Sequence, residues 1–599
     1  MAASLFTIYM LDNDSDFEQT IDDIVENFNS NCEEEDKKFN LKNNRKFHFE
    51  NIQDFKLYMR AAETEPDWSK VLVDLVTTNL NDVKNINHSY VLFIKVNEIF
   101  FAVTGGSGHH LIDSSKKYNF GLELLSRIVN EDDNYIKSVA DRHFTGKKLG
   151  GGTQYIGNVT INSERDFNNM FKEIQLALPK SVIEEKLGIN IKVNKQDYRL
   201  FAKDSIKFSK AITLNELDRL LFSVSKLMDI IPPYSILPFY QINKKASIIT
   251  ELNNVMIEDF INYLNGVQQP NDFMILPFYQ TCDKHYFKIR TGRDSLDEYT
   301  DLEELLNHFK NNVNTNMEKE DILESTKKIK LIGKVENETV IESTLFKHID
   351  SKIIHNATNY WLTEGNWYLF EREFIENINN TFTQKVTKSY DLNFKLNNLQ
   401  VWESGKEGDF NFSHISTPNT FVLDKILVNK IELCDLLIEE GDKLYFVHVK
   451  DGLDGDVRVL SNQIVHSMET VSEGINFKGT TLIKYYQSIK NKIKDHSEED
   501  LESSISISAR KFIDRFESQE NFVNFIKEKK KDIVFVFAFR PKAIHDLYNP
   551  SSITSTAAKL SMITLTNTVN DYDFQLEFMQ IERHNETTNK LSTDKLIIP

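Results

Sequence analysis

Residues 431–450, which read IELCDLLIEEGDKLYFVHVK, constrain the fold of this chain more than any other segment. Two runs rich in β-branched and aromatic residues flank a charged turn that contains Gly441, a pattern that predicts an antiparallel β-hairpin. If Gly441 and the residue after it form a two-residue turn, counting back along both strands places Asp435 opposite His448. Lys450 then lies on the same strand face as His448, because successive side chains of a strand alternate between faces.

This pairing sorts the hairpin into an apolar face and a mixed face. The apolar face is suited to packing against a helix and consists of Cys434, Leu436, Ile438, Tyr445, Val447 and Val449. The mixed face places a carboxylate, an imidazole and an ammonium among Leu433, Leu437 and Phe446. Burying these groups is costly unless they contact one another, a metal ion or a ligand. The alternative is a solvent-facing hairpin whose polar face has no function.

The arrangement resembles the core of PD-(D/E)XK nucleases, in which an Asp on one strand and an acid-x-Lys tripeptide on the next hold a divalent cation beside a phosphodiester. The tripeptide here is His448-Val449-Lys450, so a histidine stands where the acid is expected. Mg²⁺ prefers carboxylate and water oxygens, whereas imidazole suits softer ions such as Mn²⁺ or Zn²⁺. The resemblance implies a divalent metal cofactor, Mg²⁺ or Mn²⁺, with Asp435 and His448 among its ligands.

Upstream of the hairpin, residues 367–382 carry apolar residues at helical spacing and predict a helix. Such a helix precedes the hairpin in the nuclease core. We expect Glu376 on this helix to be a further metal ligand. Glu371 and Glu373 are alternatives, and a solvated acidic helix face without any metal is another.

Downstream of the hairpin, Ser461 is predicted to cap a helix with one apolar stripe. In RecB-like members of the nuclease class a glutamine on this helix faces the site. Gln463 is the matching residue, although Ser467 stands where those enzymes often have a tyrosine. The predicted elements that follow are a strand buried on both faces, a helix and a closing strand, at residues 533–539, 555–570 and 574–581.

The amino-terminal half has a glycine-rich turn of its own. Two predicted strands joined near Asn97 lead into Gly105, Gly106 and Gly108. Glycine permits positive φ and close backbone approach, so a phosphate-binding turn is one interpretation. The segment lacks the Walker lysine and the full dinucleotide fingerprint. An ordinary tight turn is the alternative.

The net charge of −19 argues against a protein that coats nucleic acid over its whole surface. Local basic patches are the candidate contacts for nucleic acid, with DNA expected first. They comprise Arg142 with Lys147 and Lys148, residues 327–334, residues 490–494, and residues 527–531 with Arg540 and Lys542. The alternative for each patch is a set of scattered, solvated lysines.

Several classes of protein are disfavoured by what the chain lacks. Its three cysteines are widely spaced, which indicates neither a disulfide framework nor a cysteine-based zinc site. No stretch approaches the apolar length needed to span a bilayer, and the start lacks the pattern of a secretion signal. We therefore expect a cytoplasmic protein without membrane contact.

Short segments along the chain carry a second resemblance. They are FAVTGGSGHHLID with residues 119–122, SVADRHFTG, residues 152–154, residues 365–368, Glu432 with Cys434 and Asp435, residues 448–450 and residues 460–463. In this order they are similar to the pattern of a sporadically distributed bacterial family of unknown function, in which the histidine before Val-Lys belongs to the pattern. The patchy occurrence of that family resembles that of genome-defence genes, which implies an antiviral role and a phage-derived trigger or partner protein.

Together these patterns predict an α/β chain, α+β overall, with three domains. Residues 1–200 are expected to form an α+β domain that contains the glycine-rich turn. Residues 201–345 form a mixed or helical middle domain. Residues 346–599 form the PD-(D/E)XK-like domain, a mixed sheet flanked by helices.

The favoured function is metal-assisted hydrolysis of phosphodiesters in foreign nucleic acid, DNA before RNA. Asp435 would bind the cation, His448 would act as ligand or general base, and Lys450 would stabilise the pentacovalent phosphate or orient water, with Gln463 completing the set. The alternative is a non-catalytic sensor or scaffold that keeps the fold and binds nucleic acid or a phage protein. The histidine and the acidic charge favour the sensor, whereas the same-face geometry of the hairpin favours catalysis. A homo-oligomer is compatible with both.

Overall fold

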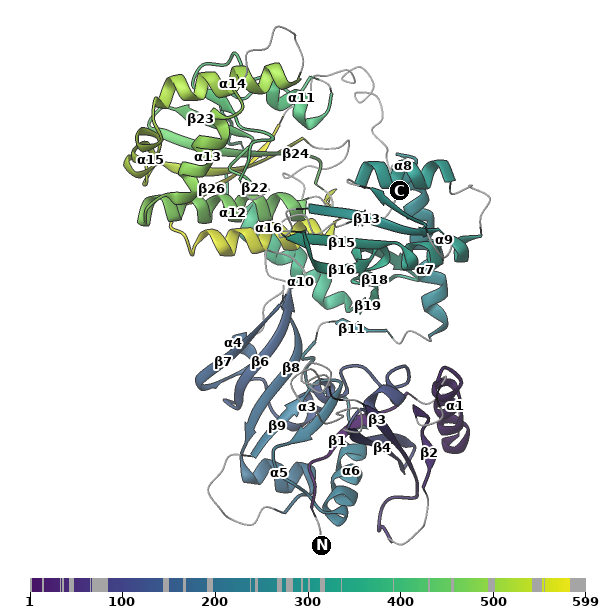
Figure 1. The fold of residues 1–599 in the computed structure, drawn as a ribbon. Coiled ribbons are helices and arrows are strands. Elements are labelled where there is room, and N and C mark those ends of the chain that lie inside the picture. The colour runs from purple at the N-terminus through teal and green to yellow at the C-terminus, as the bar shows by residue number, and fades with distance from the viewer. Residues whose placement is uncertain are drawn as a thin grey trace, which may run out of the picture. The chain divides into compact units, whose positions relative to one another are not determined.

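The chain divides into two compact units (Figure 1). Unit 1 comprises Met1–Arg142 and Gly150–Thr250, and unit 2 comprises Glu251–Pro599. The predicted boundaries near residues 200 and 345 remain predictions. The structure, a computed structural model, describes residues 3–12, 16–32, 34, 37–42, 48–64, 66, 84–143, 150–164, 169–190, 198–237, 239–242, 246–266, 272–275, 284–291, 295–299, 302–312, 318–335, 337–391, 393–403, 405–428, 431–453, 457–493, 501–540, 552–553 and 555–581.

Unit 1 is built on a ten-stranded sheet with the strand order β2-β3-β4-β5-β1-β10-β9-β8-β6-β7. Its strands are β1 (Thr7–Met10), β2 (Asn40–Leu41), β3 (Asp54–Thr64), β4 (Asn85–Val96), β5 (Ile99–Gly105), β6 (Ile136–His143), β7 (Gly150–Val159), β8 (Asn169–Leu178), β9 (Tyr198–Ala202) and β10 (Ser205–Phe208); a further short strand is β11 (Phe239–Gln241). Its helices are α1 (Phe17–Ser30), η3 (Gly108–Ile112), α3 (Phe120–Ile128), α4 (Ile161–Glu164), α5 (Lys180–Leu187) and α6 (Leu214–Met228).

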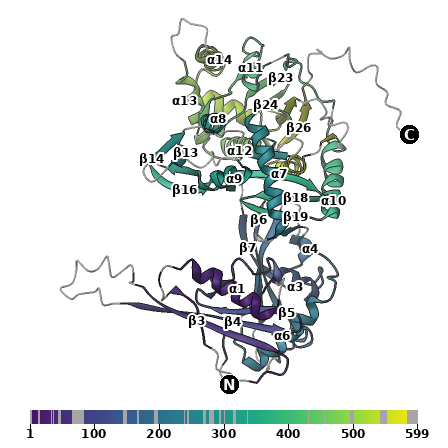
Figure 2. The same cartoon turned by 90° about the vertical axis from the view of Figure 1, so that its right-hand side faces the viewer.

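Helices cover both faces of this sheet because its central strands are apolar on both sides. In β5, Phe101 and Val103 pack with α3, α5 and α6, whereas Phe100 and Ala102 pack with α1 and η3. Figure 2 shows α1 and α6 on opposite sides of β4 and β5. The helix α6 begins with a capping box between Thr213 and Glu216, the signal that fixes its start.

Unit 2 contains three larger sheets and a two-stranded one, β21-β22. Its strands are β12 (Asp272–Ile275), β13 (Lys284–Thr291), β14 (Ser295–Tyr299), β15 (Lys330–Val335), β16 (Glu338–Thr344), β17 (Ile349–His355), β18 (Thr358–Thr363), β19 (Asn366–Phe370), β20 (Thr420–Val422), β21 (Leu427–Val428), β22 (Ile431–Glu432), β23 (Leu436–Glu440), β24 (Lys443–Asp451), β25 (Ile533–Arg540) and β26 (Gln575–Gln580). Its helices are α7 (Ser247–Leu264), α8 (Leu302–Asn312), α9 (Lys319–Lys328), η5 (Leu345–His348), α10 (Arg372–Phe382), η6 (Thr383–Thr387), α11 (Glu407–Phe412), α12 (Val457–Asn476), α13 (Thr480–Lys490), α14 (Leu501–Phe516), α15 (Gln519–Glu528) and α16 (Thr556–Val569).

The sheet that carries the hairpin is mixed, with the order β20-β23-β24-β25-β26. β20, β23 and β24 run antiparallel, and β25 and β26 continue parallel to β24. A parallel neighbour requires a crossover connection, which here contains α12, α13, α14 and α15. In Figure 1, α12 and α16 lie side by side next to this sheet.

The predicted hairpin register is confirmed. Glu440 pairs with Lys443, and the ladder continues to Leu436 opposite Val447. Gly441 occupies the turn with φ +62°, a conformation that glycine adopts without strain. The predicted apolar face forms one core with β25 residues; its members include Leu436, Ile438, Tyr445, Val447, Val449, Val534 and Val536.

One predicted helix is wrong in its first turn. Residues 366–370 form β19, and the helix starts only at Arg372. Trp367 and Tyr368 are buried and pair with β18, because aromatic side chains fit a half-buried strand surface better than a helix start. Only Phe374 and later residues of the predicted stripe belong to the helix.

The architecture is mixed α+β over several sheets, as the sequence predicts. Within the described ranges, no helix combines the length and the apolarity that crossing a bilayer requires.

Candidate functional site

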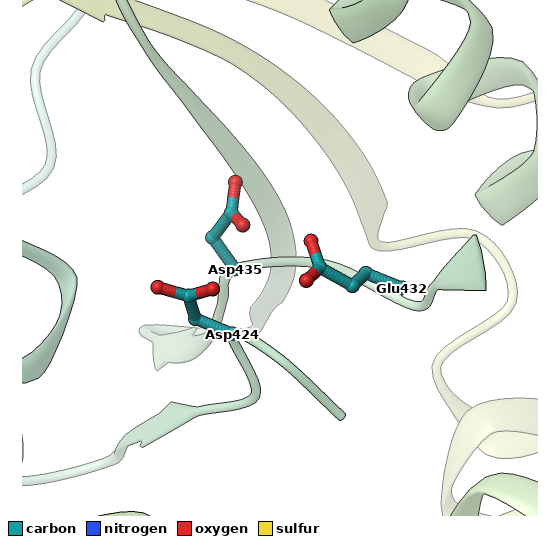
Figure 3. Close-up of side chains that lie close together, drawn as sticks. All are labelled: Asp424, Glu432 and Asp435. Carbon is teal, nitrogen blue, oxygen red and sulfur yellow. The ribbon is translucent and has the colours of Figure 1, made fainter. Parts of the chain in front are cut away.

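Three carboxylates meet beside the start of β23: those of Asp424, Glu432 and Asp435 (Figure 3). Each offers one oxygen, and these oxygens lie within 4.8 Å of one another. Asp424 follows β20, Glu432 ends β22, and Asp435 lies in the bend before β23. The short hairpin of β21 and β22 reverses the chain and so brings Asp424 and Glu432 together.

Backbone groups hold two of these carboxylates in place. Asp435 Oδ2 accepts a hydrogen bond of 2.6 Å from the N–H of Val449, and Glu432 Oε1 accepts one of 2.9 Å from the N–H of Lys425. Both bonds leave further oxygen lone pairs on each carboxylate for a ligand. The site is therefore preorganised by the hairpin backbone.

Asp424 is oriented by a buried amide. Asn411 on α11 is fully buried, and its Nδ2 donates a 3.0 Å hydrogen bond to Asp424 Oδ2. Among the described residues, Asn411 Oδ1 has no hydrogen-bond partner. Buried polar atoms are nearly always paired, so this oxygen is an acceptor available to a donor.

The electrostatics of the cluster disfavour three negative charges without a proton or a cation. Burial, followed by the charges of Glu432 and Asp424, raises the pKa of Asp435 well above its usual value. Burial and the charge of Asp424 also raise the pKa of Glu432 to about 7. Three close carboxylates repel one another when all are ionised, so they take up a proton or a metal ion. Their oxygen-only donor set suits Mg²⁺ or Mn²⁺.

Lys450 forms an ion pair with Glu407, next to the acidic cluster. Its Nζ is 3.3 Å from an oxygen of Glu407 on α11. Burial raises the pKa of Glu407, and the charge of Asp424 adds to this, while Lys450 and the N–H of Asp451 act in the opposite direction. The structure thus brings two predicted residues, Asp435 and Lys450, to one site.

His448 does not join them. Its side chain is 1% exposed, burial lowers its pKa to about 3, and its Nε2 has no hydrogen-bond partner within the described part of the chain. The ladder begins at Leu436, so Asp435 lies in the bend, where its carboxylate is anchored to Val449 instead of facing the imidazole. His448 is therefore a neutral core residue in this structure, and its predicted role as ligand or base has no geometric support.

Replacing His448 with Leu should leave Mn²⁺ affinity unchanged and reduce acid sensitivity. The pKa of His448 is lower in the folded state than in the unfolded chain, so between about pH 6.5 and 3 only the unfolded chain takes up the proton. As the pH falls through this window, the free energy of unfolding therefore decreases by about 1.4 kcal/mol per pH unit. The substitution also removes a buried nitrogen that has no hydrogen-bond partner among the described residues, which should raise the free energy of unfolding by about 1–3 kcal/mol. Calorimetric Mn²⁺ titrations and thermal melts at pH 5 and 7 measure both effects. Loss of Mn²⁺ affinity would restore His448 as a ligand.

The other predicted site residues lie elsewhere. The side chain of Glu376 is 57% exposed and pairs with Arg372 at 2.9 Å, and the carboxylates grouped with Asp435 in the described ranges do not include it. Gln463 is half buried on α12, one turn before Ser467, whose hydroxyl donates to the carbonyl of Leu433. Gln463 therefore lies on the helix face that approaches the hairpin.

The predicted phosphate-binding turn is packed against β4. A Cβ at Gly105 would lie 2.1 Å from Tyr90 Cε1, and one at Gly108 would lie 2.2 Å from the carbonyl oxygen of Tyr90. Gly106 has φ +58°. Close approach of the turn to β4 accounts for these glycines without a ligand. Phosphate binding at this turn stays a prediction.

The predicted basic patches are partly engaged in ion pairs. Lys327 pairs with Glu324 at 2.9 Å, and Arg540 donates from Nε to Asp451 Oδ1 at 2.8 Å. Other members fall outside the described residues: Lys147, Lys148, Lys494 and Lys542. Nucleic-acid contact through these patches stays a prediction.

The sequence pattern of the hairpin does not indicate four residues that belong to the site: Asp424, Glu432, Glu407 and Asn411. The acidic residues that immediately precede the hairpin, Asp424 and Glu432, were the available signal. Their convergence depends on β21 and β22, which are only two residues long each and carry no sequence signature. Glu407 and Asn411 come from α11, a six-residue helix that no periodicity reveals.

Comparison with known proteins assigns the chain to a family. No curated protein and no solved structure matches it. The family described as "Family of unknown function (DUF6119)" matches residues 6–581, a range that contains every residue of the acidic cluster. The expected membership in a family of unknown function is thereby confirmed, and the chain belongs to the DUF6119 family.

Proposed function

We propose that this protein is a divalent-metal-dependent nuclease of the PD-(D/E)XK type. The observation that carries the proposal is the convergence of three buried or half-buried carboxylates with Lys450 at the ends of β23 and β24. In an unassigned structure, carboxylates with perturbed pKa values beside a specific charge partner are candidates for a functional site.

The order of elements around the site supports the proposal. A helix precedes the β23–β24 hairpin, α12 follows it, and β25 lies beside β24. These are the elements expected of the nuclease core. The nuclease core has an acid where this chain has His448, and in this proposal Asp424 and Glu432 supply the acidic groups in its place.

Each residue has a distinct task in this mechanism. Asp424, Glu432 and Asp435 would hold the cation, which when bound polarises a phosphate oxygen and lowers the pKa of water. Lys450 places a positive charge where negative charge develops on the phosphate. Glu407 fixes the Lys450 ammonium by its ion pair. The substrate would be foreign nucleic acid, DNA before RNA, in a defence role that rests on the resemblance in occurrence noted above.

A sensor without catalysis is the second candidate, and the net charge of −19 favours it. Purified protein incubated with plasmid, linear DNA and RNA in Mg²⁺ or Mn²⁺ separates the two. Metal-dependent cutting supports the nuclease. Binding without cutting under every metal supports the sensor, and neither binding nor cutting contradicts both.

Replacing Lys450 with Ala should lower the cleavage rate by about 10²–10³-fold, the usual cost of removing one group that stabilises transition-state charge. Mn²⁺ affinity should stay within a few fold, because Lys450 is not a ligand. Cleavage kinetics and calorimetric Mn²⁺ titration measure the two effects. The control is Lys484→Ala, at an exposed lysine on α13. A Lys450 variant that cuts as fast as the unmodified protein contradicts the assignment.

A further inference from the structure

Arg540 is the last residue of β25 and lies beside the end of the strand that carries Lys450. The parallel ladder pairs Lys450 with Phe539 and Asp451 with Arg540. The guanidinium of Arg540 donates from Nε to Asp451 Oδ1 at 2.8 Å and from Nη2 to Asp451 Oδ2. Two parallel bonds of this kind fix both the position and the plane of the carboxylate, which a single bond would leave free to rotate.

The same guanidinium also rests on the aromatic residues that support α11. Its central carbon lies 4.2 Å from the centre of the Trp402 ring. Trp402 is fully buried and stacks on Phe410 of α11, with 4.5 Å between the ring centroids and the ring planes 10° apart. A cation above a desolvated indole ring is held more firmly than an exposed one. Arg540 therefore connects the end of β24 to α11.

A second connection between α11 and β24 passes through Glu407. Its carboxylate accepts a hydrogen bond from the N–H of Asp451, and it lies 3.3 Å from the Nζ of Lys450. The contacts thus form a closed circuit, in which Arg540 is the member that β25 contributes. A shift of Asp451 or of α11 would move the carboxylate that holds the Lys450 ammonium.

A similar arginine lies at the other end of the hairpin. Arg515 on α14 donates from Nε and Nη2 to the two carboxylate oxygens of Glu439, both at 3.1 Å, and its guanidinium carbon is 5.1 Å from the centre of the Phe525 ring. Glu439 pairs with Leu444 next to the turn, whereas Lys450 lies at the opposite end of β24. Arg515 thus makes the same two kinds of contact away from the site, which makes it a matched control.

We infer that Arg540 is a positioning residue of the proposed cleavage, which holds the Lys450 ammonium in place through Asp451 and Glu407. The inference rests on the proposed function and adds to it the residue that keeps Lys450 where charge develops on the phosphate. Lysine at position 540 would keep the positive charge, but it has no planar fork to hold the carboxylate or to stack on Trp402. Displacement of a reacting group by about 1 Å can cost on the order of 10²-fold in rate. The loss should therefore appear in kcat and not in metal affinity.

The test is a double-mutant cycle on the full-length protein, with plasmid DNA and Mn²⁺. Arg540→Lys should lower kcat by about 10–10²-fold and leave KM and Mn²⁺ affinity within about twofold. In a protein that already carries Lys450→Ala, Arg540→Lys should change kcat by less than about twofold, because no ammonium is left to position. Arg515→Lys should leave kcat unchanged in both backgrounds. Equal losses from Arg540→Lys in the two backgrounds, or an equal loss from Arg515→Lys, would overturn the inference.

Acylation of lysines by an N-hydroxysuccinimide ester of acetic acid, read by peptide mass spectrometry, reports the same positioning without catalysis. An ammonium paired with a carboxylate reacts slowly, because the ion pair favours the protonated form. Arg540→Lys should raise the acylation rate of Lys450 by about three- to tenfold, and Glu407→Gln should do the same. Arg515→Lys should leave this rate unchanged, and Lys484 should react at one rate in all variants. An unchanged Lys450 rate in Arg540→Lys contradicts the inference.

Failure of the inference and of the proposed function give different results. If the unmodified protein cuts DNA but Arg540→Lys matches it in kcat and in Lys450 acylation, only the inference fails. If the unmodified protein cuts nothing with either metal, the proposed function fails, and the acylation rates still decide whether Arg540 holds Lys450 in place. Thermal melts show whether each variant is folded. Should Arg540→Lys unfold, Asp451→Asn replaces it in both measurements, because it weakens the bidentate pair and leaves Arg540 on Trp402.

Discussion

Replacing Asp435 with Asn should lower the rate of the proposed metal-dependent cleavage by on the order of 10³-fold, the upper end of what one lost charge-stabilising group costs. The Asn side chain keeps the shape and can still accept the hydrogen bond from Val449, but it removes the negative charge that the cation requires. Calorimetric titration should show no Mn²⁺ binding in the range where the unmodified protein is saturated.

The same substitution should stabilise the metal-free protein. Burial and the neighbouring Glu432 and Asp424 disfavour a charge on Asp435, so Asn relieves this repulsion. Each kcal/mol gained in the free energy of unfolding raises Tm by about 2–4 °C in a domain of about 150–250 residues. A stability gain that accompanies a loss of activity is typical of a functional site.

The matched control is Asp442→Asn, which makes the same chemical change in the exposed turn of the same hairpin. It should alter neither cleavage nor Mn²⁺ affinity. Asp435 would lose its assigned role if Asp435→Asn cut within tenfold of the unmodified rate, or if both Asn variants shifted Tm equally.

Metal binding should strengthen steeply between pH 6 and pH 7. The pKa of Glu432 is raised to about 7, so below that pH a proton must leave before the carboxylate can bind the cation. Mn²⁺ affinity should fall about tenfold for each pH unit below 7, and binding at pH 6.5 should release protons. Calorimetry in two buffers of different ionisation enthalpy measures both quantities.

The stability of the metal-free protein should change with the opposite sign. A carboxyl group whose folded-state pKa is raised stabilises the fold while it is protonated, and this contribution is lost as the pH rises through about 7. Thermal melts should therefore show a lower Tm at pH 8 than at pH 6.5 without metal. Saturating Mn²⁺ should remove the difference, because the cation replaces the proton and stabilises the folded state.

Glu432→Gln should reduce the pH dependence of Tm between pH 6.5 and 8; Asp435, whose pKa is also raised, still contributes to it. His448 affects Tm only below about pH 6.5, so its effect on Tm can be told apart from that of Glu432. Equal Mn²⁺ affinities at pH 6 and pH 8 would show that Glu432 is not a ligand.

The hairpin could be predicted because its information is local. Gly441 requires a turn, and alternation of side chains then fixes the register and both faces. The buried strand at residues 533–539 was predictable for the same reason, since a continuous apolar run is read within a few residues. The predicted cap at Ser461 is wrong, because α12 already begins at Val457 and Ser461 lies inside it. The strand β19 was missed because its aromatic residues also fit a helical stripe.

The site was only half predictable. Asp435 and Lys450 lie on the hairpin, so their proximity follows from its register. The expected contact between Asp435 and His448 is not seen, because a register places backbones opposite each other, whereas the bend at Asp435 decides where its carboxylate points. The chemical role of His448 stays a prediction. A one-residue difference in where the ladder begins is below what a sequence pattern resolves.

By itself, the sequence determined the hairpin, its apolar face and the presence of Asp435 and Lys450 at one end of it, because these depend on interactions between residues close along the chain. Only the tertiary structure decided which acids form the cluster and that His448 is buried away from it. Those facts depend on the two-residue strands β21 and β22, which contact α13 and α12, and on α11, which packs against Trp402 and β24. These tertiary contacts, and not any local propensity, fix their positions.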